Sequence, residues 1–153
     1  MASAVPEAAA LFGKVQLSGA YMAGFKQWLD MMEHGDHSGL WDLLHPDCVF
    51  WSPVVHTPQR GRPVSHAYLS AAGQVFNDSF NYTRRIIDGQ HGVFEFQCRM
   101  DSIDVNGVDI ITMDNDKIVE FKVMVRPLKA VHKVHEKMMA MLEALQSAEA
   151  AAQ

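Results

Sequence analysis

Two hydrophobic periods divide the chain. Before residue 77, apolar residues recur every three or four positions, as on one face of a helix. From Phe80 to Val125, apolar and polar residues alternate, which is the period of a half-buried strand. The helical period then returns for the rest of the chain. Helices ahead of a run of strands predict an α+β domain.

The first half is expected to be mostly helical. A first helix should run from about Pro6 to Glu33 and end at Gly35, and a short helix with Ser38 as N-cap should end before Pro46. The next segments are predicted as a strand, in which Pro53 indicates a sheet edge or a break, then a loop and a third helix: Cys48–Val55, His56–Pro63 and Val64–Phe76.

The second half should form four strands with short turns between them, followed by a long amphipathic helix over Leu128–Leu145. Such short connections cannot hold crossover helices, so neighbouring strands must pair antiparallel. The predicted strands are Phe80–Ile87, Val93–Met100, Ile103–Met113 and Ile118–Val125.

Alternation assigns the faces of these strands, and one acid falls among the core positions. If Asp101 and Ser102 form a two-residue turn, Met100 pairs with Ile103, and Asp109 points inward with the apolar set. The residues expected to face the helices are Phe94, Phe96, Cys98, Met100, Ile103, Val105, Asp109, Ile111, Met113, Val119, Phe121, Val123 and Val125.

The opposite face of the sheet mixes charge with apolar side chains. Such a face suits a homodimer interface, and a solvated sheet face is the other interpretation. The residues concerned are Glu95, Arg99, Glu120, Lys122, Arg126, Val108, Ile110 and Met124.

Composition limits the class of partner. The 153 residues carry a net charge of −5, which argues against nucleic acid or an anionic membrane as partner. The two cysteines, Cys48 and Cys98, lie in apolar runs and are expected to be free thiols in a reducing compartment. No signal peptide or membrane span is expected, so a cytoplasmic location is predicted.

Element order and two short segments resemble the nuclear transport factor 2-like superfamily, in particular its SnoaL-like group. The segments are Ser52–Gly61 and Val108–Met113 leading to Lys117-Ile118. The resemblance covers roughly residues 14–145, with flexible ends expected at 1–13 and 146–153. It implies a cone, in which a curved antiparallel sheet packs on N-terminal helices around an apolar pocket and a long helix follows.

The resemblance also shows which chemistries of this fold are incomplete in this chain. For ketosteroid isomerase, Asp109 stands where the protonated acid would be, but Ser52 replaces the carboxylate base and Trp28 replaces the tyrosine. For epoxide hydrolase, Arg99 and Asp101 suit the arginine and one acid but are expected to point outward. Val123 occupies the place of the second acid.

Two functions remain open. The first is cofactor-free acid–base chemistry of the isomerase, dehydratase, cyclase or hydrolase type on a small, mostly apolar molecule, with Asp109 and His56 as the catalytic pair. The second is a non-catalytic ligand carrier or homodimeric interaction domain. A metal is not expected, because His132, His135 and Glu136 on the last helix lack further ligands. The residues expected to bind the small molecule are Tyr21, Trp28, Ser52, Tyr68, Tyr82, Phe96, Cys98, Phe121 and Val123.

Overall fold

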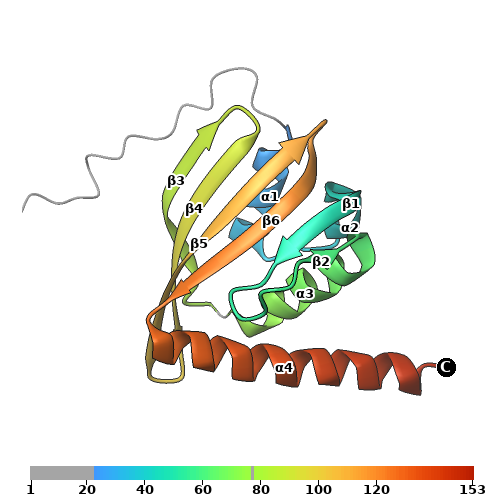
Figure 1. Ribbon diagram of the computed structural model, residues 1–153, viewed down its shortest axis with the longest axis vertical. Coiled ribbons are helices and arrows are strands. Elements are labelled where there is room, and N and C mark those ends of the chain that lie inside the picture. The colour runs from blue at the N-terminus through green and yellow to red at the C-terminus, as the bar shows by residue number, and fades with distance from the viewer. Residues whose placement is uncertain (1–22, 77) are drawn as a thin grey trace, which may run out of the picture.

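A computed structural model describes residues 23–76 and 78–153 as an α+β fold (Figure 1). The predicted order of helices and strands is confirmed within these residues except over His56–Pro63, which was predicted as a loop but contains a two-residue strand and the start of the next helix. In chain order the elements are α1 (Ala23–His34), α2 (Leu40–Leu43), β1 (Leu44–Trp51), β2 (Gln59–Arg60), α3 (Arg62–Val75), β3 (Asn81–Asp88), β4 (His91–Met100), β5 (Ile103–Asp114), β6 (Lys117–Arg126) and α4 (Leu128–Ala151).

The six strands form one open sheet in the order β2-β1-β6-β5-β4-β3. The predicted antiparallel meander is confirmed for β3 to β6, and Met100 pairs with Ile103 as expected. The sheet as a whole is mixed, however, because β1 pairs parallel with β6. A wholly antiparallel sheet was therefore the wrong expectation. Local spacing cannot reveal a pairing between strands this far apart in the sequence.

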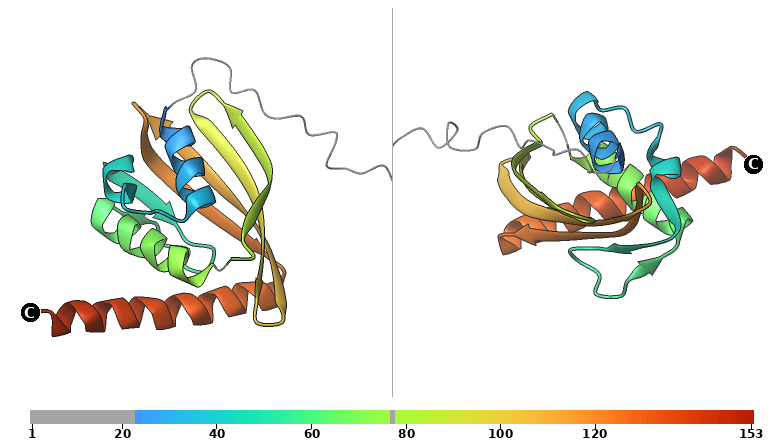
Figure 2. Two further views of the ribbon diagram at one scale, coloured as in Figure 1. Left: turned by 180° about the vertical axis from the view of Figure 1, so that it is seen from behind. Right: turned by 90° about the horizontal axis from the view of Figure 1, so that it is seen from above.

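The sheet curves around α1, and α4 crosses one end of it (Figure 2). Two groups of buried side chains hold these layers together. One joins α1 to the sheet through Phe25, Trp28, Phe94 and Phe121. The other packs α4 against β4 and β5 through Ala130 and Val134. Because α4 crosses only one end of the sheet, it covers part of the concave face. Space is left between the buried group under α1 and the buried group under α4.

The first strand begins and ends earlier than predicted. It covers Leu44–Trp51 instead of Cys48–Val55, and Pro46 lies inside it. The pairing with β6 shifts register between Leu44 and Val49, so Pro46 lies in an irregular stretch of the strand. A proline is tolerated there because its missing N–H is not needed for pairing with β6. At the other end, Ser52 Oγ accepts hydrogen bonds from the backbone N–H groups of Val54 and Val55, which turns the chain out of the sheet.

Several helix boundaries also differ from the prediction. The N-cap of α2 is Gly39 instead of the predicted Ser38, and it makes no side-chain cap hydrogen bond; the backbone N–H of Ser38 donates to the Asp36 carboxylate. The helix α4 continues to Ala151, beyond the predicted Leu145. The start of the predicted first helix lies outside the described residues. No helix within the described ranges is long and apolar enough to cross a membrane.

The predicted inner face of β4 and β5 is confirmed. Phe94, Phe96, Cys98 and Met100 are buried, and so are the inner positions of β5 from Val105 to Met113. Val119 is the exception on β6, because a register shift leaves it opposite no residue of β5. Thr112 pairs with Glu120 and Met113 with Ile118, so Ile118 takes the buried place.

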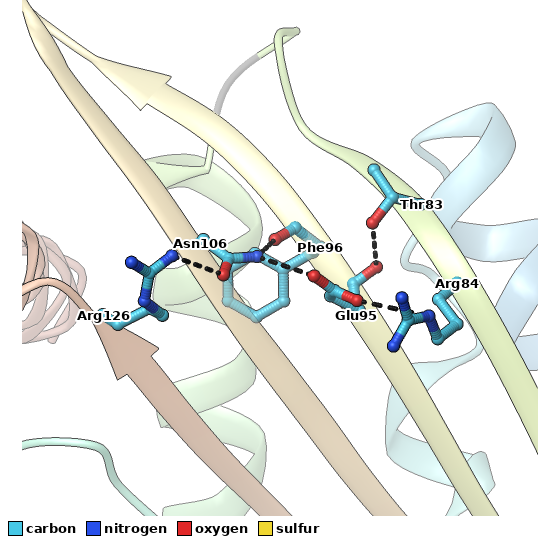
Figure 3. A network of polar contacts seen from close by, with 6 residues as sticks. All are labelled: Thr83, Arg84, Glu95, Phe96, Asn106 and Arg126. Carbon is cyan, nitrogen blue, oxygen red and sulfur yellow. Dashed lines mark hydrogen bonds and ion pairs between the residues drawn. The ribbon is translucent and has the colours of Figure 1, made fainter. Parts of the chain in front are cut away.

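The outer face carries a polar network that crosses four strands (Figure 3). Glu95 on β4 pairs with Arg84 on β3 and accepts a hydrogen bond from the side-chain amide of Asn106 on β5. Arg126 on β6 donates to the amide oxygen of Asn106 at 3.3 Å. Apolar side chains share this face, since Ile86 and Met124 are more than half exposed. The predicted mixture of charged and apolar groups is therefore present.

Candidate functional site

A cavity of about 550 Å³ lies between the concave face of the sheet and helices α1, α3 and α4. Its inner walls are largely aromatic. Phe50 stacks on Tyr68 with 5.2 Å between ring centroids, and Trp28 meets Phe121 edge-on at 5.0 Å. A cavity of this size and lining is typical of binding sites for small apolar molecules.

Asp109 is the carboxylate on the sheet floor of this cavity. It lies between Phe94 on β4 and Val123 on β6 and is 6% exposed. Burial raises the pKa of the Asp109 carboxyl to about 7, although a hydrogen bond from Tyr82 acts in the opposite direction. At neutral pH this group is therefore able both to give and to take a proton.

A chain of hydrogen bonds ends on this carboxyl. The indole N–H of Trp28 donates to the Tyr82 hydroxyl at 3.0 Å, and that hydroxyl donates to Asp109 Oδ2 at 2.6 Å. Burial, followed by the charge of Asp109, raises the pKa of Tyr82 well above its usual value, so the phenol keeps its proton. Within the described residues no hydrogen bond reaches Asp109 Oδ1, which is free for a ligand.

A β-bulge brings Tyr82 to Asp109. Tyr82 pairs with Phe96 on β4, but Arg84 pairs with Glu95, so Thr83 is an extra residue in β3. Strict alternation would place Tyr82 and Arg84 on one face of the sheet. The bulge instead turns Tyr82 toward the cavity and Arg84 toward the outer network.

The structure brings most of the predicted site residues together. Trp28, Ser52, Tyr68, Phe96, Asp109, Phe121 and Val123 line the cavity. Tyr82 does not line it and acts through Asp109. Cys98 is buried beneath α4 beside Ser79, and His56 is exposed and absent from the lining. Tyr21 lies outside the described residues.

Other lining residues were not predicted as part of the site. Phe50, Phe76 and Phe80 add aromatic walls, and the helices add Met32 and Met138. The hydrophobic periods predict that these side chains face inward. They do not distinguish a side chain packed in the core from one that lines a cavity, because that depends on the curvature of the sheet. The rim is polar, with Glu33, His34, His37, Asp78 and His135. No group of three potential metal ligands occurs in the described part of the chain.

The family model for the SnoaL-like domain matches residues 25–121, which include both Ser52 and Asp109. The chain is a SnoaL-like protein of the nuclear transport factor 2-like superfamily. A steroid delta-isomerase from Pseudomonas aeruginosa is 38% identical to this SnoaL-like chain. The match covers 82% of the chain and 93% of the isomerase, with a TM-score of 0.78.

Other solved structures share the fold of this SnoaL-like chain. An uncharacterized protein with a cystatin-like fold from Silicibacter pomeroyi is 33% identical over 77% of the chain and 84% of that protein, with a TM-score of 0.71. A putative polyketide cyclase from Sinorhizobium meliloti is 15% identical over 66% and 93%, with a TM-score of 0.53, a likeness of fold alone. No curated protein sequence matches the chain.

Proposed function

We propose that this SnoaL-like domain binds a small, largely apolar molecule in its cavity and catalyses proton transfer on it without a bound cofactor. The carboxyl of Asp109 would carry the proton. The observation behind the proposal is a buried carboxyl with a pKa of about 7 and a free oxygen beside an aromatic cavity. Such a pKa is near the optimum for general acid–base catalysis at neutral pH. The likeness to a steroid delta-isomerase supports the isomerase type among the reactions considered.

The test is exchange of carbon-bound protons in D₂O. The protein is incubated with steroidal and non-steroidal β,γ-unsaturated ketones, and NMR follows both deuterium uptake and movement of the double bond. Asp109→Asn is expected to lower the rate 10²- to 10⁴-fold, the usual effect of losing a positioned acid–base group. Asp78→Asn changes an exposed rim carboxylate and should keep the rate. A variant Asp109→Asn that retains the rate would contradict the proposal.

His56 was predicted as the partner of Asp109 in catalysis. It is exposed and does not line the cavity, so the proposal gives the proton transfer to Asp109 alone. In the same assay His56→Gln is expected to keep the rate within about twofold, since a general acid or base must lie within hydrogen-bond reach of the proton that it transfers. If His56→Gln lowers the rate as much as Asp109→Asn does, His56 and Asp109 act as a catalytic pair.

We also propose that the outer sheet face pairs two copies of the chain. Ile86 and Met124 expose apolar surface there, 53% and 55% respectively, beside a network that holds charges of both signs. If a two-fold axis passes through this face, the apolar groups of one copy meet those of the other, and charges of each sign can meet charges of the opposite sign. If no reaction is found, ligand binding and dimer formation are the functions that remain.

A further inference from the structure

Ser52 lies on the same floor of the cavity as Asp109. Trp51, the last residue of β1, pairs parallel with Lys122; Ser52 and Val123 are the residues that follow them, and Ser52 lies just outside the strand. Val123 pairs with Asp109 on its other side. All three residues line the cavity and follow the strand order β1-β6-β5 as a row, with Ser52 directly after the end of β1 and the apolar Val123 between the two polar residues.

The spacing of the strands sets the span of this row. Neighbouring strands lie about 4.8 Å apart, so the step from β1 across β6 to β5 spans roughly 10 Å. A compact molecule lying over Val123 can reach one polar group at each end. Phe50 and Phe121, which stack at 6.1 Å, flank this position as further apolar wall.

The hydrogen bonds already made by Ser52 determine what it can offer. A hydroxyl has one proton to donate and two lone pairs to accept with. The backbone N–H groups of Val54 and Val55 donate to Ser52 Oγ at 3.1 and 3.3 Å and occupy both lone pairs. The hydroxyl proton has no acceptor among the described residues, so Ser52 can donate it in a hydrogen bond to a ligand.

We propose that Ser52 is a second polar anchor, which donates a hydrogen bond to an oxygen of a ligand whose other end is held by Asp109. This inference rests on the proposed binding function and adds the class of ligand. The ligand is a compact apolar molecule with a hydroxyl at one end and a carbonyl or ether oxygen at the other.

Two probes that differ in one group test this anchor. They are 6-hydroxy-2-tetralone and 5,6,7,8-tetrahydro-2-naphthol, which share a phenol and differ in the ketone. Calorimetric titration at pH 8.5 keeps Asp109 ionised, so it accepts from the phenol and leaves the ketone to face Ser52. The ketone is expected to strengthen binding to the unchanged protein about fivefold, the effect of one net hydrogen bond.

The variants assign that gain to a side chain. Ser52→Ala is expected to remove the fivefold gain of the tetralone and leave tetrahydronaphthol binding unchanged, while Ser52→Thr keeps its hydroxyl and the gain. Asp109→Asn should weaken both probes, because both carry the phenol. Tyr68→Phe tests the alternative that another hydroxyl of this cavity, rather than Ser52, carries the gain from the ketone.

The contradicting outcomes are distinct. If Ser52→Ala weakens the binding of both probes equally, Ser52 only supports the turn at Val54 and Val55. If Ser52→Ala leaves the fivefold gain of the tetralone intact, or if Tyr68→Phe removes that gain, Ser52 is not the anchor. If tetrahydronaphthol binds in a manner sensitive to Asp109→Asn, the binding function stands whatever Ser52 does. If neither probe binds the unchanged protein, both the proposed binding and this anchor fail.

Discussion

The Tyr82 hydroxyl lies 2.6 Å from Oδ2 of Asp109 and donates its proton to that oxygen. The same hydroxyl accepts from Trp28, so its position is held from both sides. This contact occupies one carboxyl oxygen and leaves the other to the cavity. Tyr82 is therefore a positioning residue for Asp109.

Replacing Asp109 by Asn should remove a pH dependence of stability. The folded protein holds the Asp109 proton up to a pKa of about 7, whereas an unfolded chain releases it near 3.8. Stability from this group is therefore complete below about pH 4 and is lost as pH rises to about 7, by up to roughly 4 kcal/mol. Asparagine still accepts from Tyr82 but has no charge, so Asp109→Asn should be more stable than the unchanged protein at pH 8.

Urea unfolding at several pH values measures this effect. Asp47→Asn is the control, because it removes an exposed carboxylate from β1 and should follow the unchanged protein. Parallel stability curves for Asp109→Asn and the unchanged protein between pH 4 and 8 would contradict the raised pKa of Asp109.

Tyr82→Phe should raise the pKa of Asp109 further. The hydroxyl of Tyr82 lowers that pKa by stabilising the charged carboxylate, so its loss leaves only the effect of burial. The indole N–H of Trp28 also loses its acceptor, and the free energy of unfolding should fall by about 1–3 kcal/mol. NMR titration with ¹³C-labelled aspartate measures the pKa directly. Tyr68→Phe should leave it unchanged, and a lowered Asp109 pKa in Tyr82→Phe would refute this account.

Two glycine substitutions should have opposite effects. A Cβ on Gly107 would collide with the ring of Phe96 and approach the carbonyl oxygen of Met124 at 2.6 Å. Gly107→Ala should therefore destabilise the protein by about 1–3 kcal/mol, the usual cost of overpacking a core. At Gly73, inside α3, the nearest atom is 3.5 Å away on His37, and Gly73→Ala should add up to about 1 kcal/mol. Thermal unfolding compares them, and a stable Gly107→Ala would show that the strands are packed less closely.

Met124→Glu should separate the proposed dimer. A charge placed on an apolar part of an interface is costly when it is buried without a partner. Sedimentation velocity is expected to show a dimer for the unchanged chain and a monomer for Met124→Glu. Leu128→Glu is the control, since Leu128 is 71% exposed and belongs to α4 and not to the sheet. A monomeric unchanged chain, or a dimer that survives Met124→Glu, would rule out this interface.

Alternation along the chain determined the inner faces of β4 and β5, and with them the burial of Asp109. This succeeds because side chains of a regular strand change face at every residue, a property that needs no knowledge of the partner strand. The helices α3 and α4 and the turn between Met100 and Ile103 followed from similarly local rules. The candidate acid was therefore readable from the sequence.

The surroundings of that acid depended on the tertiary structure. The bulge at Thr83 decides that Tyr82 points to Asp109, and the parallel pairing of β1 with β6 brings Ser52, the residue after β1, to the wall of the same cavity. Both arise from the pairing of residues far apart in the chain, where packing of the whole sheet selects the register and overrides local alternation. The sequence thus determined which residue carries the charge, and the fold decided which side chains share its cavity.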